Sequence, residues 1–323
     1  MQEPRVVAVI VTWNRKDLLA RNLRAVKAQC RPVDEIVVID NASTDGTPEM
    51  VRSAFPSARL LRLAGNAGAA GGMHVGMREA LARGADWLWL MDDDGMPSAT
   101  CLASLLRMVA RESAALCGPL IRDIEEPDEL AFPPPLAGLP RAVEPFKRAI
   151  GADWLPTRLA GLWNGVLVSA EAARSVGLPK AEMFIWGEEH EYSHRLTRAG
   201  YRTGIALEAD YFHPRYRFPG TWLVHFEVGR RCIQKCQFCD PRSPRAAIYA
   251  RNLGYNDRHY HGLGRVVARL VAGFGLCLLR TGPAGAAQFV RYYIDGLSDR
   301  SALEPSRGAI ASRLAIAEPV RAS

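Results

Sequence analysis

The feature that most constrains the fold is a regular alternation, over the first 120 residues, of short apolar runs with segments of helical periodicity. The apolar runs cover residues 6–12, 35–39, 59–63, 87–91 and 114–121. Runs of about four to eight apolar residues are typical of buried strands, and their alternation with amphipathic helices is typical of βαβ units. We therefore expect an α/β fold with a mostly parallel central sheet flanked by helices.

Polar clusters follow the predicted strands at the points where those strands end. Asp40-Asn41 comes after the second apolar run, Gly65-Asn66 after the third and Asp92-Asp93-Asp94 after the fourth. Because open α/β sheets bind ligands at the carboxyl ends of their strands, these side chains predict a binding site along one edge of the sheet.

The regular pattern extends over only part of the chain. Segment 122–160 is rich in proline and predicts a surface loop or lid, after which regular structure resumes over 161–215. From about Arg245 the pattern is mostly helical, and residues 304–323 resemble a frayed, flexible tail. We expect an α/β domain over 1–215 and a mainly helical region over 216–323.

Charge is distributed unevenly between these two parts. The 323 residues carry a formal charge of +7, with +10 on residues 215–323 and −3 on residues 1–214. This split argues against a uniformly basic nucleic-acid coat and favours a basic C-terminal module that faces anions.

A hydrophobic content of 48% excludes a largely disordered chain. We read neither a secretory signal nor an apolar run of about 18 residues, and seven irregularly spaced cysteines favour a reducing cytoplasm.

Asp92-Asp93-Asp94 is the strongest candidate for a metal site. Three adjacent carboxylates at the end of an apolar strand repel one another, and side chains alternate, so Asp92 and Asp94 point the same way and can share one cation. Oxygen ligands suit Mg²⁺ or Mn²⁺ better than Zn²⁺. The alternative is an exposed acidic turn that caps the helix starting near Pro97. His213 follows a strand-like run and is either a further ligand or a structural histidine.

A second acidic cluster follows Gly187. Helical spacing places Glu188, Glu191 and Arg195 on one face, and Glu188 and Glu189 fall in the first turn, where the helix dipole favours a carboxylate. Such a carboxylate can act as a general base on a hydroxyl acceptor. The alternative is an ordinary acidic first turn with an internal Glu191–Arg195 pair.

The glycine-rich stretch Gly65-Asn66-Ala67-Gly68-Ala69-Ala70-Gly71-Gly72 lies between a predicted strand and helix, as a phosphate-binding loop does. It matches neither G-x-G-x-x-G nor a Walker loop.

Taken together, these features resemble family 2 glycosyltransferases of the GT-A fold, in the family's order over residues 5–215. The triple Asp and the glycine-rich stretch look most like the galactofuranosyl- and rhamnosyltransferase branch. The matching stretches are Val11-Thr12-Trp13-Asn14-Arg15, Val38-Ile39-Asp40-Asn41-Ala42-Ser43-Thr44-Asp45-Gly46-Thr47, Asn66-Ala67-Gly68, Asp92-Asp93-Asp94, Trp186-Gly187-Glu188-Glu189-His190-Glu191 and His213.

The resemblance implies a nucleotide-sugar half over about 1–121 and an acceptor half over 161–215. Trp13 would lie near a pyrimidine base, with Asp40 hydrogen-bonded to its edge. The residues that would bind the nucleotide sugar are Thr12, Trp13, Arg15, Asp40, Asn66, Gly68, Gly71 and Asp93.

The resemblance also implies that Asp92, Asp94 and His213 hold Mg²⁺ or Mn²⁺. Glu189 would be the general base, with Glu188 and Glu191 positioning the acceptor. Trp186 and Arg195 would lie on the acceptor side. The family usually has Asp at one or both of the first two acidic positions, so Glu188-Glu189 leaves open which of the two is the base.

The implied activity is an inverting, metal-dependent displacement. A sugar, with rhamnose or galactofuranose favoured, would move from a UDP- or dTDP-sugar to a hydroxyl of a glycan or polyprenyl-diphosphate-linked acceptor in cell-envelope polysaccharide synthesis. The alternative in the same fold is a non-catalytic nucleotide-sugar-binding protein, and no nucleic-acid partner is expected.

Cys232, Cys236 and Cys239 form a C-x₃-C-x₂-C pattern that resembles the cluster motif of radical S-adenosylmethionine enzymes. No β/α-barrel pattern follows it. Three thiols would also suit Zn²⁺ with a nearby ligand such as His225, and the remaining alternative is three ordinary reduced cysteines.

Segment 265–280 is apolar and bracketed by arginines. Its uninterrupted part is too short to span a bilayer, so it predicts either a helix lying in the interface beside anionic lipid or one packed on the catalytic domain. The first alternative implies a protein peripheral to the inner face of the cytoplasmic membrane.

Overall fold

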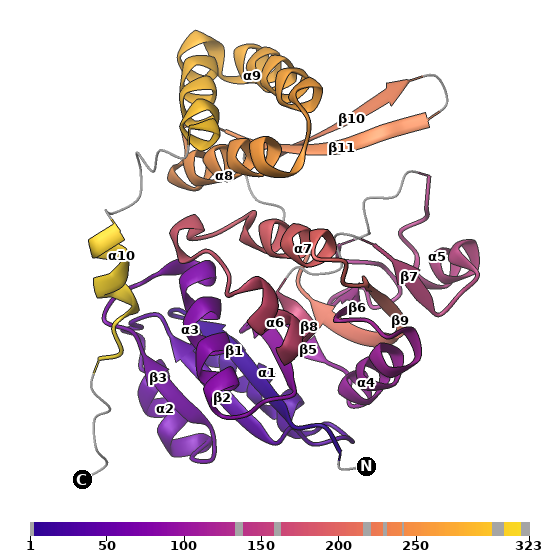
Figure 1. The fold of residues 1–323 in the computed structure, drawn as a ribbon, viewed down its shortest axis with the longest axis vertical. Coiled ribbons are helices and arrows are strands. Elements are labelled where there is room, and N and C mark those ends of the chain that lie inside the picture. Colours follow the sequence, from indigo (N-terminus) through magenta and orange to yellow (C-terminus); the bar gives the residue numbers. More distant parts are fainter. Residues whose placement is uncertain are drawn as a thin grey trace.

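The structure is a computed structural model, and it describes residues 3–132, 138–157, 163–215, 221–228, 231–240, 242–298 and 307–317. A large sheet with helices on both faces forms the lower part of the molecule, and a mainly helical part lies above it (Figure 1). The α/β fold with a helical C-terminal extension, predicted from the sequence, is confirmed.

The main sheet contains nine strands in the order β3-β2-β1-β4-β8-β6-β9-β5, with β7 paired to β9. The strands are β1 (Val6–Thr12), β2 (Glu35–Asp40), β3 (Arg59–Arg62), β4 (Trp87–Asp92), β5 (Met96–Pro97), β6 (Leu116–Asp123), β7 (Trp154–Pro156), β8 (Asn164–Ser169) and β9 (Thr203–His213).

The first four strands along the chain are mutually parallel, as the alternating pattern predicts. The sheet as a whole is mixed, because β8 runs antiparallel between β4 and β6, and β5 and β7 run antiparallel to β9. The direction of β8 depends on which strands lie beside it in the sheet. Apolar periodicity along the sequence does not indicate those neighbours.

Two hydrophobic cores cover the two faces of the sheet. Strand β1 is buried on both, with Val7, Val9 and Val11 facing one core and the intervening residues facing the other. The flanking helices are α1 (Lys16–Lys27), α2 (Thr47–Ala54), α3 (Gly68–Ala82), α4 (Cys101–Glu112), α5 (Val143–Ile150), α6 (Ala170–Val176) and α7 (Glu188–Arg198), with the 3₁₀ turn η1 (Ala181–Met183) before α7.

Glycines bring α3 unusually close to β1. A Cβ at Gly76 would lie 2.2 Å from Val9 Cγ1, and one at Gly72 would lie 2.5 Å from Val11 Cγ1. Both positions therefore require the absence of a side chain. This packing fixes the start of α3 at the carboxyl edge of the sheet. The loop before it, residues 63–67, is held there too and is called the Asn66 loop below.

Two sequence expectations need correction. Segment 122–160 is not a continuous loop, because β6 extends to Asp123 and the segment also contains α5 and β7. The predicted frayed tail contains helix α10 (Arg307–Leu314), which lies beside α3 (Figure 1). After α10 the backbone pairs with the end of β3, where Ala64 N donates to Ala315 O at 2.8 Å.

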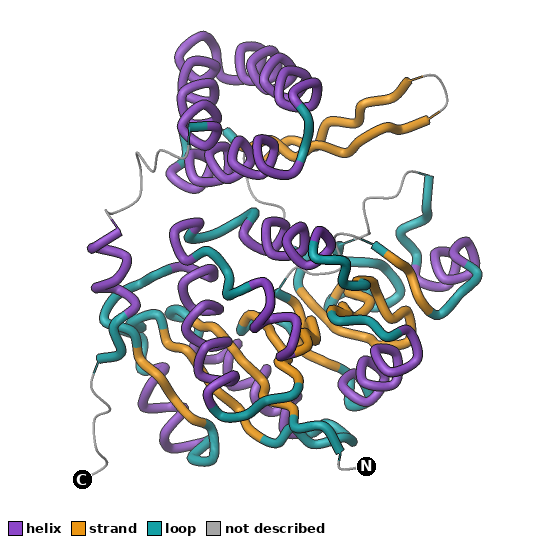
Figure 2. Tube along the Cα trace, in the orientation of Figure 1, coloured by secondary structure: helices purple, strands orange, loops and turns teal. Residues whose placement is uncertain are grey.

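The C-terminal part begins with an antiparallel hairpin of β10 (Thr221–Val228) and β11 (Arg231–Cys239), which the helical expectation missed (Figure 2). Helices α8 (Pro244–Tyr260) and α9 (Leu263–Leu297) then pack on each other around Cys277, Phe289 and Tyr293. Helix α9 is kinked at Gly282, ahead of Pro283. Within the described ranges, no helix has both the length and the apolar character needed to cross a membrane.

Candidate active site

Side chains from the ends of β1 and β4 form one hydrogen-bonded group at the carboxyl edge of the sheet. Thr12 Oγ1 donates to Asp93 Oδ2 at 2.6 Å. Arg15 Nη1 lies 3.1 Å from Asp93 Oδ1 and 2.5 Å from Asp94 Oδ2. Burial raises the pKa of Asp93 to about 6, although Arg15 opposes the shift. The four residues therefore come together as predicted.

His213, at the end of β9, faces Asp94. Its Nε2 lies 3.0 Å from Asp94 Oδ1, and its Nδ1 lies 2.7 Å from Pro214 O. In the tautomer that donates Nδ1–H to this carbonyl, Nε2 presents a lone pair to a carboxylate. A cation bound by both would satisfy two acceptors that otherwise face each other, so this pair fits a divalent metal.

The structure does not gather all three predicted metal ligands. In the part of the chain that is described, no cluster of three His, Cys, Asp or Glu side chains is arranged to hold an ion. Burial, with Asp94 and Asp93 nearby, raises the pKa of Asp92 well above its usual range. Mg²⁺ is commonly held by one or two carboxylates together with substrate phosphates and water. Asp94 and His213 would thus suffice as protein ligands beside a diphosphate.

Asp40, at the end of β2, is fully buried. Its Oδ1 accepts a hydrogen bond from Ser43 N at 3.0 Å. Its Oδ2 has no hydrogen-bond partner among the described residues, and the nearest cation, Arg62 Nε, is 3.5 Å away. Burial raises the pKa of Asp40. Trp13 is 47% exposed, one residue beyond Thr12, which is the register partner of Asp40. An unsatisfied acceptor beside an exposed indole suits a base that has an N–H on its edge.

The Asn66 loop is held by Asn41. Asn41 belongs to the motif at the end of β2 but is not among the site residues predicted from the sequence. Asn41 Nδ2 donates to Gly68 O at 3.1 Å, and its Oδ1 accepts from Ala67 N at 3.2 Å. Asn66 Oδ1 accepts from Gly68 N at 2.8 Å. The loop conformation is therefore fixed by side-chain amides.

Packing explains the two predicted loop glycines. Gly68 has φ +71°, and a Cβ there would lie 2.1 Å from Phe184 O. A Cβ at Gly71 would lie 2.5 Å from Ala67 Cβ and 3.1 Å from Leu314 Cδ2. Gly68 thus allows the Asn66 loop to approach Phe184, in the segment before α7. Gly71 leaves room for Ala67 and for Leu314 of α10.

Glu188 and Glu189 are both buried at the start of α7. Glu188 Oε1 accepts from Trp163 Nε1 at 3.2 Å, and Glu189 Oε2 accepts from Gly187 N at 2.9 Å. Burial, together with Glu189, raises the pKa of Glu188 well above its usual range. Glu189 also contributes to the raised pKa of Asp92. The two predicted acidic clusters therefore act on each other within one site.

Comparison with known proteins agrees with this geometry. Residues 7–156 match the family described as "Glycosyl transferase family 2". Galactofuranosyltransferase GlfT1 of Mycobacterium tuberculosis is 40% identical over 293 residues, which are 88% of this chain and 93% of the relative. The chain belongs to glycosyltransferase family 2.

Two further similarities refine this assignment. The N-acetylglucosaminyl-diphospho-decaprenol L-rhamnosyltransferase of M. tuberculosis is 27% identical over 236 residues, which are 66% of this chain and 76% of that protein. The predicted galactofuranosyl- and rhamnosyltransferase branch is thereby confirmed. The structure of GalNAc-T7 with UDP, GalNAc and Mn²⁺ superposes with a TM-score of 0.58 at 15% identity, over 92% of this chain and 57% of that one, and shares the GT-A fold.

In this glycosyltransferase, Glu191 and Arg195 bind each other and neighbouring elements. Glu191 is fully buried, and its oxygens accept from Tyr260 Oη at 2.7 Å and Arg195 Nε at 2.9 Å. Arg195 also donates to the carbonyls of Val176 and Leu178. These contacts anchor α7 to α8 and α6 and include the internal Glu191–Arg195 pair. The acceptor-side role of the two residues stays a prediction. Trp186 lies edge-on to Tyr249.

The cysteine pattern lies on the hairpin. Cys232, Cys236 and Cys239 belong to β11, and His225 to β10, but the side chains of both strands lie outside the described residues. Neither zinc nor an iron–sulfur cluster gains support, and membership of this family overturns the radical-enzyme alternative.

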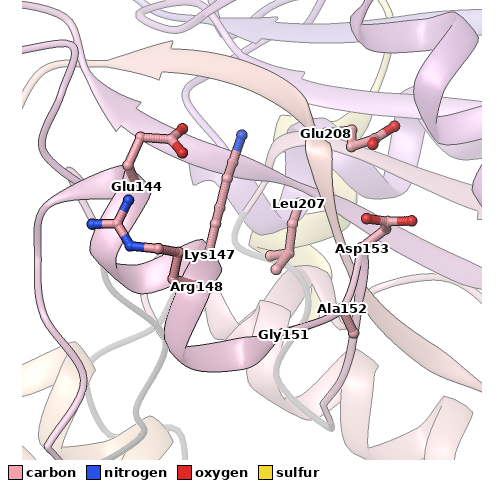
Figure 3. Close-up of a pocket in the computed structure, with 8 residues that line it drawn as sticks. All are labelled: Glu144, Lys147, Arg148, Gly151, Ala152, Asp153, Leu207 and Glu208. Atoms are coloured by element: carbon pink, nitrogen blue, oxygen red, sulfur yellow. The ribbon is translucent and has the colours of Figure 1, made fainter.

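A separate hollow lies between α5 and β9 (Figure 3). Two of its carboxylates are paired with arginines, Glu208 with Arg107 and Asp153 with Arg111. It contains none of the predicted site residues, and its charged groups are mixed in sign. This hollow is therefore separate from the predicted site around Asp92-Asp93-Asp94.

Proposed function

We propose that this glycosyltransferase moves galactofuranose from its UDP-linked form to a hydroxyl of a polyprenyl-diphosphate-linked glycan, in cell-envelope polysaccharide synthesis. The 40% identity to GlfT1, against 27% to the rhamnosyltransferase, favours galactofuranose over rhamnose. The rhamnosyltransferase is named for a diphospho-decaprenol acceptor, which supports a lipid-linked acceptor here. Rhamnose from a dTDP-sugar is the alternative donor.

The observation that carries a catalytic function is the meeting of the two acidic clusters at Trp163, whose carbonyl accepts from Asp92 N at 2.8 Å and whose indole N–H donates to Glu188 Oε1 at 3.2 Å. We infer that Glu189 accepts the proton of the acceptor hydroxyl while that oxygen attacks the anomeric carbon and the nucleoside diphosphate departs from the opposite face. The result is inversion in one displacement. Burial raises the pKa of Glu188 beside it and so favours its protonated form.

A bound Mg²⁺ or Mn²⁺ would supply charge stabilisation for the departing diphosphate. Asp94 and His213 would hold it, and Arg15 keeps Asp93 and Asp94 from repelling each other. Asp40 accepts the imide N–H of uracil through Oδ2, which makes no hydrogen bond to the described residues. The Mn²⁺ in GalNAc-T7 supports metal use in this fold.

Helix α9 supports a peripheral association with the membrane. Five apolar side chains, 40% to 77% exposed, recur at intervals of three or four residues and so share one helix face; they are Leu263, Val267, Val271, Phe274 and Leu278. Arg269 and Arg265 lie on the opposite side, near Asp257 at 2.9 Å and 3.6 Å. We infer that this apolar stripe, rather than the bracketing arginines, enters the lipid interface.

The test is a donor panel of UDP-galactofuranose, UDP-galactopyranose and dTDP-rhamnose with a polyprenyl-diphosphate glycan acceptor, with nucleoside diphosphate release as the signal. UDP-galactofuranose with Mn²⁺ should give the fastest release, and EDTA should abolish it. Faster release from dTDP-rhamnose would move the assignment to rhamnosyl transfer. Binding of UDP without release from any donor would favour the non-catalytic alternative.

A further inference from the structure

One face of α8 binds the backbone segment that leads into the general base. Asn252 Nδ2 lies 2.8 Å from Met183 O, 3.1 Å from Ile185 O and 2.8 Å from Trp186 O. Asn252 is 1% exposed. The NH₂ group of one buried amide thus lies within hydrogen-bond distance of three carbonyls in the short segment before α7.

The orientation of this amide is fixed by Arg251. Arg251 Nε and Nη2 donate to Asn252 Oδ1 at 3.1 and 2.8 Å. Because a guanidinium can only donate, the oxygen of Asn252 must face Arg251 and its NH₂ group must face the segment. Arg251 also donates to Glu182 O at 3.0 Å, and Asn256 Nδ2 donates to Gly187 O at 2.9 Å.

The segment needs these donors because its backbone conformation is unusual. Phe184 and Trp186 both have φ +63°, and Gly187 has φ +105°. Left-handed conformations are costly for residues with a Cβ, and persist only where the surroundings enforce them. Here the carbonyls of the segment turn toward α8, which satisfies them within the protein.

The same segment touches both halves of the site. Phe184 O accepts from Ala70 N at 3.0 Å, at the start of α3 and beside the Asn66 loop. Gly187 N donates to Glu189 Oε2 at 2.9 Å. A shift of residues 184–187 would therefore displace the carboxylate of Glu189 relative to the Asn66 loop.

We propose that Asn252 is a positioning residue for catalysis, which acts through the 183–187 segment to hold Glu189 against the bound donor. Arg251 and Asn256 complete the same surface of α8. The C-terminal helices are thus required for turnover, beyond any role at the membrane. This inference rests on the proposed function only in naming Glu189 as the base.

The test compares Asn252→Ala with Leu253→Ala, which alters the same helix on the side that packs against α9. Asn252→Ala should lower kcat about 100-fold, because misplacing a reacting group by about 1 Å has an effect of that size. KM for the donor and the affinity for UDP with Mn²⁺ should change by less than about threefold, since the donor residues are untouched. Leu253→Ala should lower thermal stability while keeping kcat within about threefold.

Hydrogen exchange provides a readout independent of turnover. Peptides covering 183–190 should exchange faster in Asn252→Ala, with those from β1 unchanged. If Asn252→Ala fails to fold, Asn252→Asp keeps the shape of the side chain and removes its donors, and should give the same results. Unchanged exchange, unchanged kcat, or an equal loss of kcat in Leu253→Ala would overturn the proposal. If no donor is turned over, the proposed function fails, whereas the exchange experiment still decides the role of Asn252.

Discussion

Trp163 donates its indole N–H to one oxygen of Glu188 at 3.2 Å, whereas the other oxygen is buried and has no hydrogen-bond partner in the described part of the chain. Burial and the adjacent Glu189 both raise the pKa of Glu188 well above its usual range. The protonated form of Glu188 is therefore favoured, which leaves Glu189 as the candidate base.

This division of roles predicts unequal effects of two matched substitutions. Glu188→Gln keeps the size of the side chain and an oxygen that can accept from Trp163 Nε1, and should keep kcat within about tenfold. Glu189→Gln removes the base and should lower kcat by about 10²-fold or more. Both variants should bind UDP with Mn²⁺ as the unaltered protein does, by calorimetry. The reverse order of effects would make Glu188 the base.

A second prediction concerns the cation. Asp94→Asn removes the charge that faces His213 and should abolish the effect of Mn²⁺ on UDP affinity, with kcat reduced about 100-fold, because a metal supplies several kcal/mol of charge stabilisation. Asp17→Asn, on the exposed first turn of α1, is the matched control and should change neither quantity. Metal-dependent binding that persists in Asp94→Asn would contradict the assignment.

Base selectivity follows from Oδ2 of Asp40, which makes no hydrogen bond among the described residues and lies 3.5 Å from Arg62 Nε. Uracil presents an N–H at position 3, whereas cytosine presents a lone pair, so the protein should bind UDP at least about tenfold more tightly than CDP. Asp40→Asn can donate as well as accept, and should reduce that preference to less than about threefold. Competition titration with both nucleotides measures it. Equal affinities in the unaltered protein would place the base elsewhere.

Positions at the ends of neighbouring strands made part of the site predictable. The Asp92-Asp93-Asp94 run lies at the end of its strand, and β1 and β4 are neighbours in the sheet, so Thr12 and Arg15 reach it as expected. The roles of the individual residues stay predictions.

Contacts made by the C-terminal helices could not be foreseen in the same way. Glu191 and Arg195 match an acceptor-side motif, yet Tyr260, 69 residues along the chain, binds Glu191. Asn252 belongs to no local motif, and its partners lie 66 to 69 residues away. Helical periodicity identifies a buried face without stating what covers it. Helix α10 is likewise held by contacts with α3 and with the end of β3, which the sequence of residues 304–323 does not indicate.

The pH dependence of stability should include a contribution from His261. Burial lowers its pKa to about 4, and the neighbouring Arg265, His194, Arg269 and Arg198 act in the same direction. An unfolded histidine titrates near 6.5, so the unfolded chain binds more protons between about pH 4 and 6.5. Stability is therefore lost as pH falls through that window.

His261→Gln should make the melting temperature less sensitive to pH between 7 and 4.5 or so. Because the side chain is only partly buried, solvent screening keeps the difference small, about a few degrees for a chain of this size. Differential scanning calorimetry of both proteins across the window gives the comparison. Parallel curves would mean that His261 does not contribute.

The apolar stripe on α9 predicts binding to vesicles by burial of side chains rather than by charge. Val271→Asp combined with Phe274→Asp should reduce co-flotation with phosphatidylcholine–phosphatidylglycerol vesicles by about tenfold or more, since each buried apolar side chain contributes about 1.5–3 kcal/mol. Leu279→Asp, which is 85% exposed but lies off the stripe, is the control and should have little effect. Salt should weaken binding only modestly, because Arg269 is paired with Asp257. Equal losses from Leu279→Asp, or binding that high salt abolishes, would assign the interaction to general surface charge or hydrophobicity instead of the stripe.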